Sequence, residues 1–259
     1  MVKRVILLTL VLTLPLLVSC RGSATPEVAL QSLDEIQAQM DAGNYRVAVE
    51  ALQALTEQEP ENAEAYFLLG LSNFNLGNFS DARAAFERTL ELDSGRAGAV
   101  HHNLGALAYQ MGDLEEAVSQ FQAALELEPE DPDTHYQLGA TYLQLALPPT
   151  GGPPDSTLLA QAEGEFNRAL ELAPGKAEAL VGLGNVYLQQ GNFEEAIEAL
   201  EQALEKNPEM PEALFALGGA YLQTGQISEA RDALQRFLET NPPAVYTQQA
   251  QDLLQRLEE

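Results

Sequence analysis

The chain has 259 residues, and its 39 acidic residues against 13 lysines and arginines give a formal net charge of −26. Nucleic acid and anionic lipid surfaces would repel such a chain, so binding to either polyanion is disfavoured. The acidic residues would also keep solvent-exposed helix surfaces soluble without any partner. Because the chain holds one cysteine, no disulfide bond within the chain can stabilise it.

The chain opens with a segment typical of export. Lys3 and Arg4 precede an apolar run, Val5 to Val18, which is short for a membrane span. A basic start before a short apolar run indicates a signal peptide rather than a transmembrane helix. The run ends in Leu-Val-Ser followed by Cys20, the single cysteine of the chain.

These last four residues resemble a bacterial lipobox. The resemblance implies that a signal peptidase removes residues 1–19 and that lipid, palmitate included, is attached to Cys20. Residues 20–28 would form the lipidated end and a polar tether, and several acyl chains would anchor the protein stably. The alternative is an ordinary signal peptide or an uncleaved anchor that holds a cysteine by chance. We predict an exported, membrane-anchored lipoprotein on the periplasmic or extracellular face, with outer and cytoplasmic membrane both open.

From about residue 29 onward, one pattern recurs along the chain. The glycines expected to end the first helix of a unit are Gly43, Gly77, Gly112, Gly191 and Gly225. At intervals of 34 or 35 residues, and once of 45, the units close on Pro60, Ser94, Pro129, Pro174, Pro208 and Pro242. A fixed period of this length indicates an array of repeated helix pairs.

The unit from Ala177 to Met210 shows the pattern most clearly. Both of its halves place small and apolar residues at i, i+3, i+4 and i+7, so each half predicts a helix with one apolar stripe. Gly184 would let the two helices approach closely, and Gly191 would take the positive φ of a helix C-terminal cap. Asn192 would then cap the second helix in a capping box with Glu195.

The repeated pattern strongly resembles the tetratricopeptide repeat (TPR) family, which has Leu-Gly early in the first helix, glycine at the turn and proline at the close. A clear copy holds His101 to Gly105, Gly112, Ala117, Phe121 and Pro129. The resemblance implies an all-α fold, a right-handed superhelical solenoid of stacked antiparallel helix pairs. The expected parts are units over residues 29–62, 63–96, 98–131, 132–176, 177–210 and 211–244, together the array 29–244, and a C-terminal capping helix over residues 244–259.

Two units depart from the pattern. The first unit has Glu35 and Ile36 where the Leu-Gly pair is expected, as terminal repeats often do because one face has no neighbour. The fourth unit holds an insertion from Leu147 to Thr157, whose prolines and glycines continue neither helix. A tolerated surface loop (147–157) and a partner-contacting loop are both open.

The resemblance also implies a binding surface, because the first helices of such arrays line a concave wall on which family members bind extended peptides. The residues at the usual contact positions are Phe67, Leu71, Phe74, Asn75, His102, Tyr109, Gln110, Tyr136, Gln144, Asn185, Gln189, Phe215 and Gln223. Apolar side chains of a partner could pack on the aromatic rings while the amides pair with its backbone. Leu143, Leu188 and Leu222, at similar positions, could equally belong to the core. The basic residues of members that clamp an acidic peptide terminus are missing from these positions.

The sequence gives no pattern typical of catalysis or of a metal site. His101 and His102 are adjacent on a predicted helix and therefore diverge, and with His135 they lack further ligands at suitable spacing. No nucleophile elbow, phosphate loop, metalloprotease helix or paired-cysteine motif occurs in the sequence. We therefore predict no enzyme, no cofactor, no metal and no nucleic-acid partner.

Together these patterns predict a membrane-anchored extracytoplasmic scaffold that binds a protein or an extended peptide through the concave face of its array. The alternative is an assembly factor for a machine of the cell envelope. It would resemble the type IV pilus pilotins, lipoproteins of similar size and repeat number that help secretin subunits assemble in an outer membrane. This alternative rests on architecture, which hosts many functions. An enzyme or a hydrolase accessory is disfavoured.

Overall fold

The computed structural model describes residues 31–149 and 151–257, which form thirteen α-helices, one short 3-10 helix and no strand. The elements are α1 (Leu33–Asp41), α2 (Tyr45–Gln58), α3 (Ala63–Asn75), α4 (Phe79–Leu92), η1 (Ser94–Arg96), α5 (Ala97–Met111), α6 (Leu114–Leu127), α7 (Pro132–Ala146), α8 (Ser156–Leu172), α9 (Ala177–Gln190), α10 (Phe193–Lys206), α11 (Pro211–Gln223), α12 (Ile227–Glu239) and α13 (Ala244–Arg256). None of the described helices combines the length and the apolar character needed to cross a membrane. The predicted signal peptide and Cys20 lie outside the described residues.

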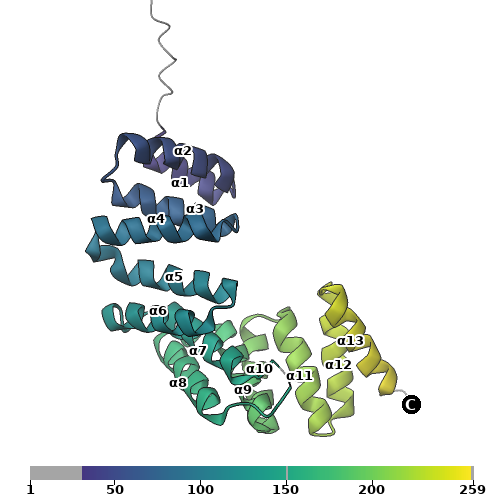
Figure 1. Ribbon diagram of the computed structural model, residues 1–259. Coiled ribbons are helices and arrows are strands. Elements are labelled where there is room, and N and C mark those ends of the chain that lie inside the picture. Colours follow the sequence, from purple (N-terminus) through teal and green to yellow (C-terminus); the bar gives the residue numbers. More distant parts are fainter. Residues whose placement is uncertain (1–30, 150, 258–259) are drawn as a thin grey trace, which may run out of the picture.

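The helices pack as antiparallel pairs, and the pairs stack in chain order (Figure 1). From α1 to α11, the first helix of each pair also contacts the first helix of the next pair. Across residues 31–149 and 151–257, no two second helices make contacts of that extent. The first helices therefore form the inner layer of a curved stack, and the second helices form its outer layer. The predicted all-α solenoid of stacked helix pairs is confirmed.

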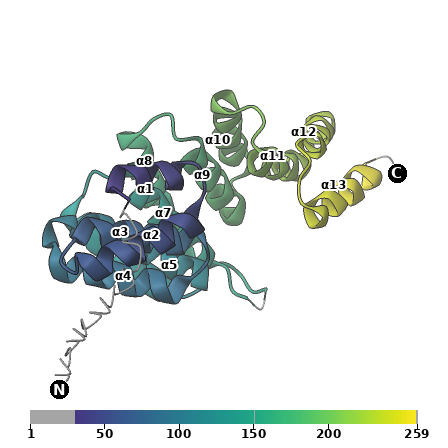
Figure 2. The same cartoon turned by 90° about the horizontal axis from the view of Figure 1, so that it is seen from above.

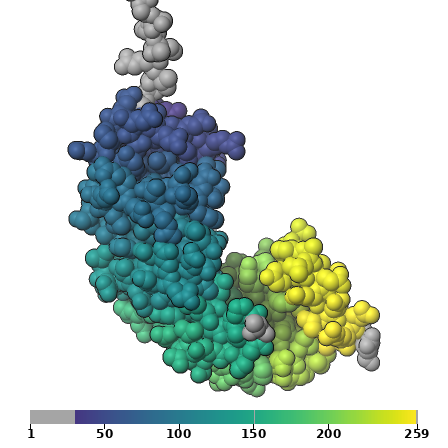
Figure 3. All heavy atoms as spheres, viewed as in Figure 1, coloured from purple at the N-terminus to yellow at the C-terminus, as the bar shows by residue number. Residues whose placement is uncertain are grey.

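The stack bends between its two halves. Helices α1 to α6 lie above one another, and the later helices turn away from that column (Figure 1). Seen from above, α10 to α13 extend to one side of the rest (Figure 2). The space-filling view shows a hollow between the N-terminal helices and the C-terminal helices (Figure 3). Because the inner layer consists of first helices, these helices face the inside of the bend.

In five of the six units, a glycine on the first helix faces a large side chain on the second helix. A Cβ added to Gly70 would lie 2.5 Å from a ring atom of Phe86, and one added to Gly105 would lie 2.7 Å from a ring atom of Phe121. The same contact joins Gly139 to Phe166, Gly184 to Leu200, and Gly218 to Leu234. All five large side chains are fully or almost fully buried, so each fills the space against a helix backbone that a side chain would otherwise occupy. The close approach predicted at Gly184 is confirmed.

The first unit packs its helix pair in a different way. Ile36, which stands where the other units have this glycine, is fully buried in the core of α1, α2 and α3. The facing position on α2 holds Leu52, also fully buried, in place of the phenylalanine of units two to four. A larger residue on the first helix is therefore combined with a leucine on the second, and the unit keeps an apolar core.

The turns between paired helices follow the prediction for their glycines. Gly43, Gly77, Gly112, Gly191 and Gly225 have φ values of 76°, 76°, 82°, 81° and 75°. A side chain at these φ values would be strained, whereas glycine adopts them at no steric cost. The backbone can therefore reverse direction within two residues.

The capping box predicted at Asn192 is wrong. The Asn192 side chain makes no capping hydrogen bond, and its amide instead donates to Gln190 Oε1 at 3.0 Å. Its backbone N–H donates to the carbonyl of Tyr187 at 2.9 Å, and its ψ of 70° falls short of the extended conformation of a side-chain cap. A capping box forms instead at the start of α1, between Ser32 and Glu35.

The insertion of the fourth unit and the last helix complete the fold. Residues 147–155 form the loop between α7 and α8, and the N–H of Asp155 donates to the carbonyl of Ala146 at 2.8 Å. The Asp155 side chain caps α8, which begins at Ser156. Helix α13 packs on α12 with Ala250 fully buried, and three leucines of this last segment join the core of the sixth unit.

The glycine contact predicts opposite effects for one substitution at two sites. Gly105→Ala places a Cβ against Phe121 and should lower the free energy of unfolding by about 1–2 kcal/mol. Gly164→Ala, in the middle of α8 with no other atom within 4 Å of the new Cβ, should raise it by about 0.5–1 kcal/mol because alanine favours a helix. Urea unfolding of the two variants measures both values. A Gly105→Ala variant as stable as Gly164→Ala would contradict the packing argument.

Candidate functional site

The predicted contact residues all lie on first helices. Helix α3 carries Phe67, Leu71, Phe74 and Asn75; α5 carries His102, Tyr109 and Gln110; α7 carries Tyr136 and Gln144; α9 carries Asn185 and Gln189; α11 carries Phe215 and Gln223. We call the exposed surface of these first helices the inner wall. The structure thus brings the predicted residues into one layer, one group per unit.

One exposed amide recurs in the last turn of five successive first helices. The five are Asn75, Gln110, Gln144, Gln189 and Gln223, each at the thirteenth position of its unit. The Asn75 amide donates to the carbonyl of Leu71 at 2.8 Å. Within the part of the chain that the structure describes, the other four side chains make no hydrogen bond to protein groups. These amides can therefore pair with a polar group from outside the chain.

The aromatic residues of the inner wall are shared between surface and core. The ring of Phe67 packs against Phe86 with centroids 6.0 Å apart, and Phe74 packs against Phe79 at 6.1 Å. Phe215 likewise packs on Phe237 at 5.0 Å. All three wall residues are half-buried, so each ring stabilises its unit and leaves part of its surface open.

Arg96, at the boundary of the second and third units, covers one of these rings. Its guanidinium lies 5.6 Å from the ring centroid of Phe67, within the range of a cation–π contact. The same side chain forms ion pairs with Glu64 and, at 3.3 Å, with Asp93. The charge of Arg96 is therefore neutralised by carboxylates of its own neighbourhood.

Lys176 repeats this arrangement two units later. Its Nζ lies 5.2 Å from the ring centroid of Tyr136 and forms an ion pair with Asp133. The prediction that basic residues are missing from the wall is therefore wrong for Arg96 and Lys176, which the sequence analysis placed only at unit ends. Both cations are already paired, so the wall still offers no free clamp for an acidic peptide terminus.

A spacing in the sequence could have revealed both cations. Arg96 follows the aromatic Phe67 by 29 residues and the carboxylate Glu64 by 32 residues. Lys176 stands in the same relation to Tyr136 and Asp133 once the insertion between α7 and α8 is removed from the count. A boundary residue folds back over the fifth position of the preceding first helix, which a search within single units misses.

His102 lies at the interface between α5 and α7. Its Nδ1 is 2.6 Å from Thr134 Oγ1, and the Thr134 hydroxyl donates in turn to Asp131. The threonine proton is thus committed to Asp131, so the His102 Nδ1–H is the donor to Thr134. Burial lowers the pKa of His102, although Asp131 at 3.8 Å opposes that shift. His102 therefore joins two units, with part of its ring still exposed.

The other two histidines bind within their own units. His101 Nδ1 lies 2.8 Å from Gln120 Oε1, and His135 Nδ1 lies 2.6 Å from Glu165 Oε2, at equivalent places of the third and fourth units. Among the described residues, no three histidine, cysteine, aspartate or glutamate side chains are grouped to hold a metal ion. Each of these histidines ties the first helix of its unit to the second.

The middle of the inner wall is acidic. Burial raises the pKa of Tyr136, and the carboxylates of Glu178 and Glu212 raise it further, so both lie near this ring. Burial also raises the pKa of Tyr109. Over residues 31–149 and 151–257, neither Glu178 nor Glu212 forms an ion pair. A neutral or basic segment would fit this surface better than an acidic one.

Comparison with known proteins places the chain among repeat proteins. A family model described as Tetratricopeptide repeat matches residues 33–97 and 181–245, and a second of the same description matches residues 158–203. A third, described as TPR repeat, matches residues 105–145. Among curated proteins, the chain is similar to Protein CTR9 homolog of Arabidopsis thaliana, with 28% identity over 102 residues. That match spans 39% of this chain and 9% of the plant protein.

Several solved structures share the fold. PilF from Pseudomonas aeruginosa is 18% identical with a TM-score of 0.70, over 85% of this chain and 94% of PilF. PilW, a widely conserved type IV pilus biogenesis factor, is 15% identical with a TM-score of 0.70, over 87% and 96% of the two chains. YrrB, a TPR protein with an unusual peptide-binding site, is 22% identical with a TM-score of 0.58, over 79% and 99%. Together with the matches along its length, the stacked helix pairs and their glycine contacts show that the chain belongs to the tetratricopeptide repeat family.

Proposed function

We propose that this protein is a membrane-anchored scaffold that binds an extended segment of a protein partner along the inner wall. The observation that carries the proposal is the row of amides at one position of five successive units, exposed beside half-buried aromatic rings. Amides on a regular spacing can pair with the backbone of an extended chain, and the open ring surfaces can receive its apolar side chains. Repeats of this family typically serve as interaction scaffolds rather than catalysts.

The acidic surface near Tyr136 supports a partner segment that is neutral or basic. Glu178 and Glu212 face no cation of the described chain, and the net charge of −26 would favour the approach of a basic partner. The same charge disfavours nucleic acid as a partner. Lipid on Cys20 and the tether of residues 20–28 would hold the array close to the membrane surface, with the choice of membrane open.

A second candidate function is assembly of a machine of the cell envelope. It is supported by the likeness to PilW, a type IV pilus biogenesis factor, which extends over 96% of PilW. A pilotin-like protein would use the same inner wall on one dedicated partner, a membrane subunit such as a secretin. The identity of the bound partner distinguishes this candidate from a general scaffold.

The anchor is tested by Cys20→Ser. Without the sulfur there is no site for lipid, so we expect the variant to move from the membrane fraction to the soluble fraction or to stay unprocessed. Fractionation and mass spectrometry of the N-terminus measure both outcomes. Ser23→Ala, in the tether, is the matched control and should leave anchoring unchanged. Normal processing and membrane fractionation of Cys20→Ser would refute the lipoprotein proposal.

The inner wall is tested by photo-crosslinking in the native membrane. A photoreactive residue at Gln110 or Gln144 should give the same covalent product, because both positions face one bound segment. The same probe at Gln202, an exposed residue of the second helix α10, should give at least about fivefold less of it, since that helix belongs to the outer layer.

Mass spectrometry then identifies the crosslinked segment. A neutral or basic extended segment agrees with the proposal, and a secretin subunit would favour the assembly factor. A product formed equally well from Gln202, or none from the two wall positions, would contradict binding at the inner wall.

A further inference from the structure

The outer layer holds open grooves between neighbouring second helices, and one of them carries its own guanidinium. In the groove between α4 and α6, Arg83 donates to the two carboxylate oxygens of Glu116 at 2.5 and 3.3 Å. This hydrogen bond raises the pKa of Arg83, and the charges of Glu87 and Asp113 add to the effect. The groove thus places one arginine among three carboxylates.

The groove between α10 and α12 is the largest cleft found on this layer and carries a surplus of acid. It is an open cleft of about 540 Å³. Its floor is apolar and buried, made of Leu204, Leu217 and Ala233. Its exposed rim is formed by the carboxylates of Glu201, Glu205, Glu229 and Asp232. A ligand here would meet an apolar surface below and negative charge on both sides.

The two grooves correspond position by position, because they lie between equivalent helices of the repeat. The α10–α12 groove keeps two of the three carboxylates of the α4–α6 groove and lacks its arginine. The corresponding residues are Glu201 and Glu87, Glu229 and Glu116, and Ile197 and Arg83. Equivalent carboxylates therefore bind a guanidinium in one groove, and in the other the arginine position is an isoleucine.

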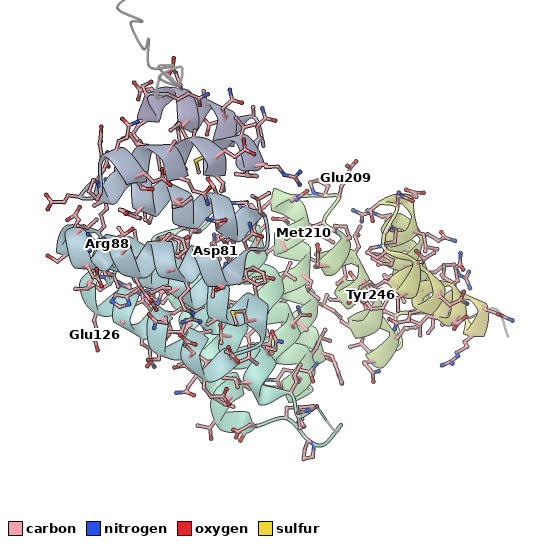
Figure 4. All side chains as sticks on the ribbon, turned by 45° about the horizontal axis from the view of Figure 1, so that its top comes forward. Asp81, Arg88, Glu126, Glu209, Met210 and Tyr246 are labelled. Atoms are coloured by element: carbon pink, nitrogen blue, oxygen red, sulfur yellow. The ribbon has the colours of Figure 1, made fainter. Side chains whose placement is uncertain are left out.

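Arg236, also at this cleft, has a different role. Its guanidinium donates to the carbonyl of Pro208 at 3.1 Å and stays 3.8 Å from Asp232. Arg88 on α4 makes the same bond to the carbonyl of Pro60 at 3.2 Å (Figure 4). Both arginines tie a second helix to the end of the preceding unit, so Arg236 leaves the carboxylates on the α10 side unneutralised.

Tyr221 fixes one of these carboxylates at the cleft. Its hydroxyl donates to Glu201 Oε1 at 2.5 Å, and the side chain is 8% exposed. Burial, together with this bond, raises the pKa of Tyr221, so the hydroxyl stays protonated and keeps donating. In the groove between α6 and α8, the amide of Gln122 occupies the place of Glu201 and bonds Tyr142 at 2.9 Å. The carboxylate at Glu201 is thus a feature of this groove that the fold does not require.

We propose that the cleft between α10 and α12 binds an arginine side chain of a partner protein, in the place that Arg83 takes in the α4–α6 groove. The aliphatic stem would lie on the leucine floor, and the guanidinium would bond Glu229 and Glu201. Arginine suits the place because its planar fork matches carboxylates and is weakly hydrated. The site lies on the outer layer, so it stands or falls independently of binding at the inner wall.

The test uses the full chain labelled with 3-fluorotyrosine, in detergent, and titrates it with Nα-acetyl-L-arginine methylamide. The chain has eight tyrosines, and Tyr221→Phe assigns the fluorine resonance of Tyr221. We expect a saturable shift of that resonance with a midpoint of about 1–10 mM, as for one charge-assisted contact with an apolar stem. The citrulline analogue, which has the same shape without the charge, should give no saturable shift.

Two variants sharpen the test. Glu201→Gln with Glu229→Gln should weaken binding about fivefold to thirtyfold, and Gln at 201 should keep the Tyr221 bond as Gln122 does with Tyr142. Ile197→Arg supplies the guanidinium from within the chain and should abolish the response to the probe. Equal shifts of all tyrosines, equal shifts with citrulline, or an unchanged midpoint in the double variant would overturn the proposal.

Discussion

The contact of a helix glycine with a phenylalanine or leucine on the paired helix is the constraint on which the rest of this structure depends. With no side chain at Gly70 or Gly105, the two helices of a unit come close enough for a buried ring to rest on backbone. Because the same contact recurs in five units, every unit has nearly the same shape. Similar units stack with the same offset, and the first helices remain on the inside of the resulting curve.

This regularity turns one position of the sequence into a row in space. The amides from Asn75 to Gln223 lie in a row because each stands at the same place in its unit. The same rule explains the outer grooves, where equivalent positions hold an arginine, a glutamine or an isoleucine against similar carboxylates. Conserved geometry supplies the frame, and the residues that vary between units, such as Arg83 and Ile197, give each groove its own chemistry.

The sequence predicted the features that follow from a period. Helix pairs, turn glycines and the close approach at Gly184 are confirmed because each depends on residues within one unit. The capping box at Asn192 was wrong because the glycine turn already satisfies the backbone there. Arg96 and Lys176 were missed on the inner wall because they cross to the preceding unit, and that neighbour is set by the stack. Cys20 and the wall residues as binding sites stay predictions.

The most direct measurement of the central contact is a double-mutant cycle in urea unfolding with Gly105→Ala and Phe121→Ala. Removing the ring takes away every atom that the new Cβ would meet in the wild-type chain. We predict that Gly105→Ala, destabilising alone, becomes neutral or stabilising by up to about 1 kcal/mol when Phe121 is alanine. If its effect is the same in both backgrounds, within about 0.5 kcal/mol, the glycine contact does not set the spacing of the helix pair.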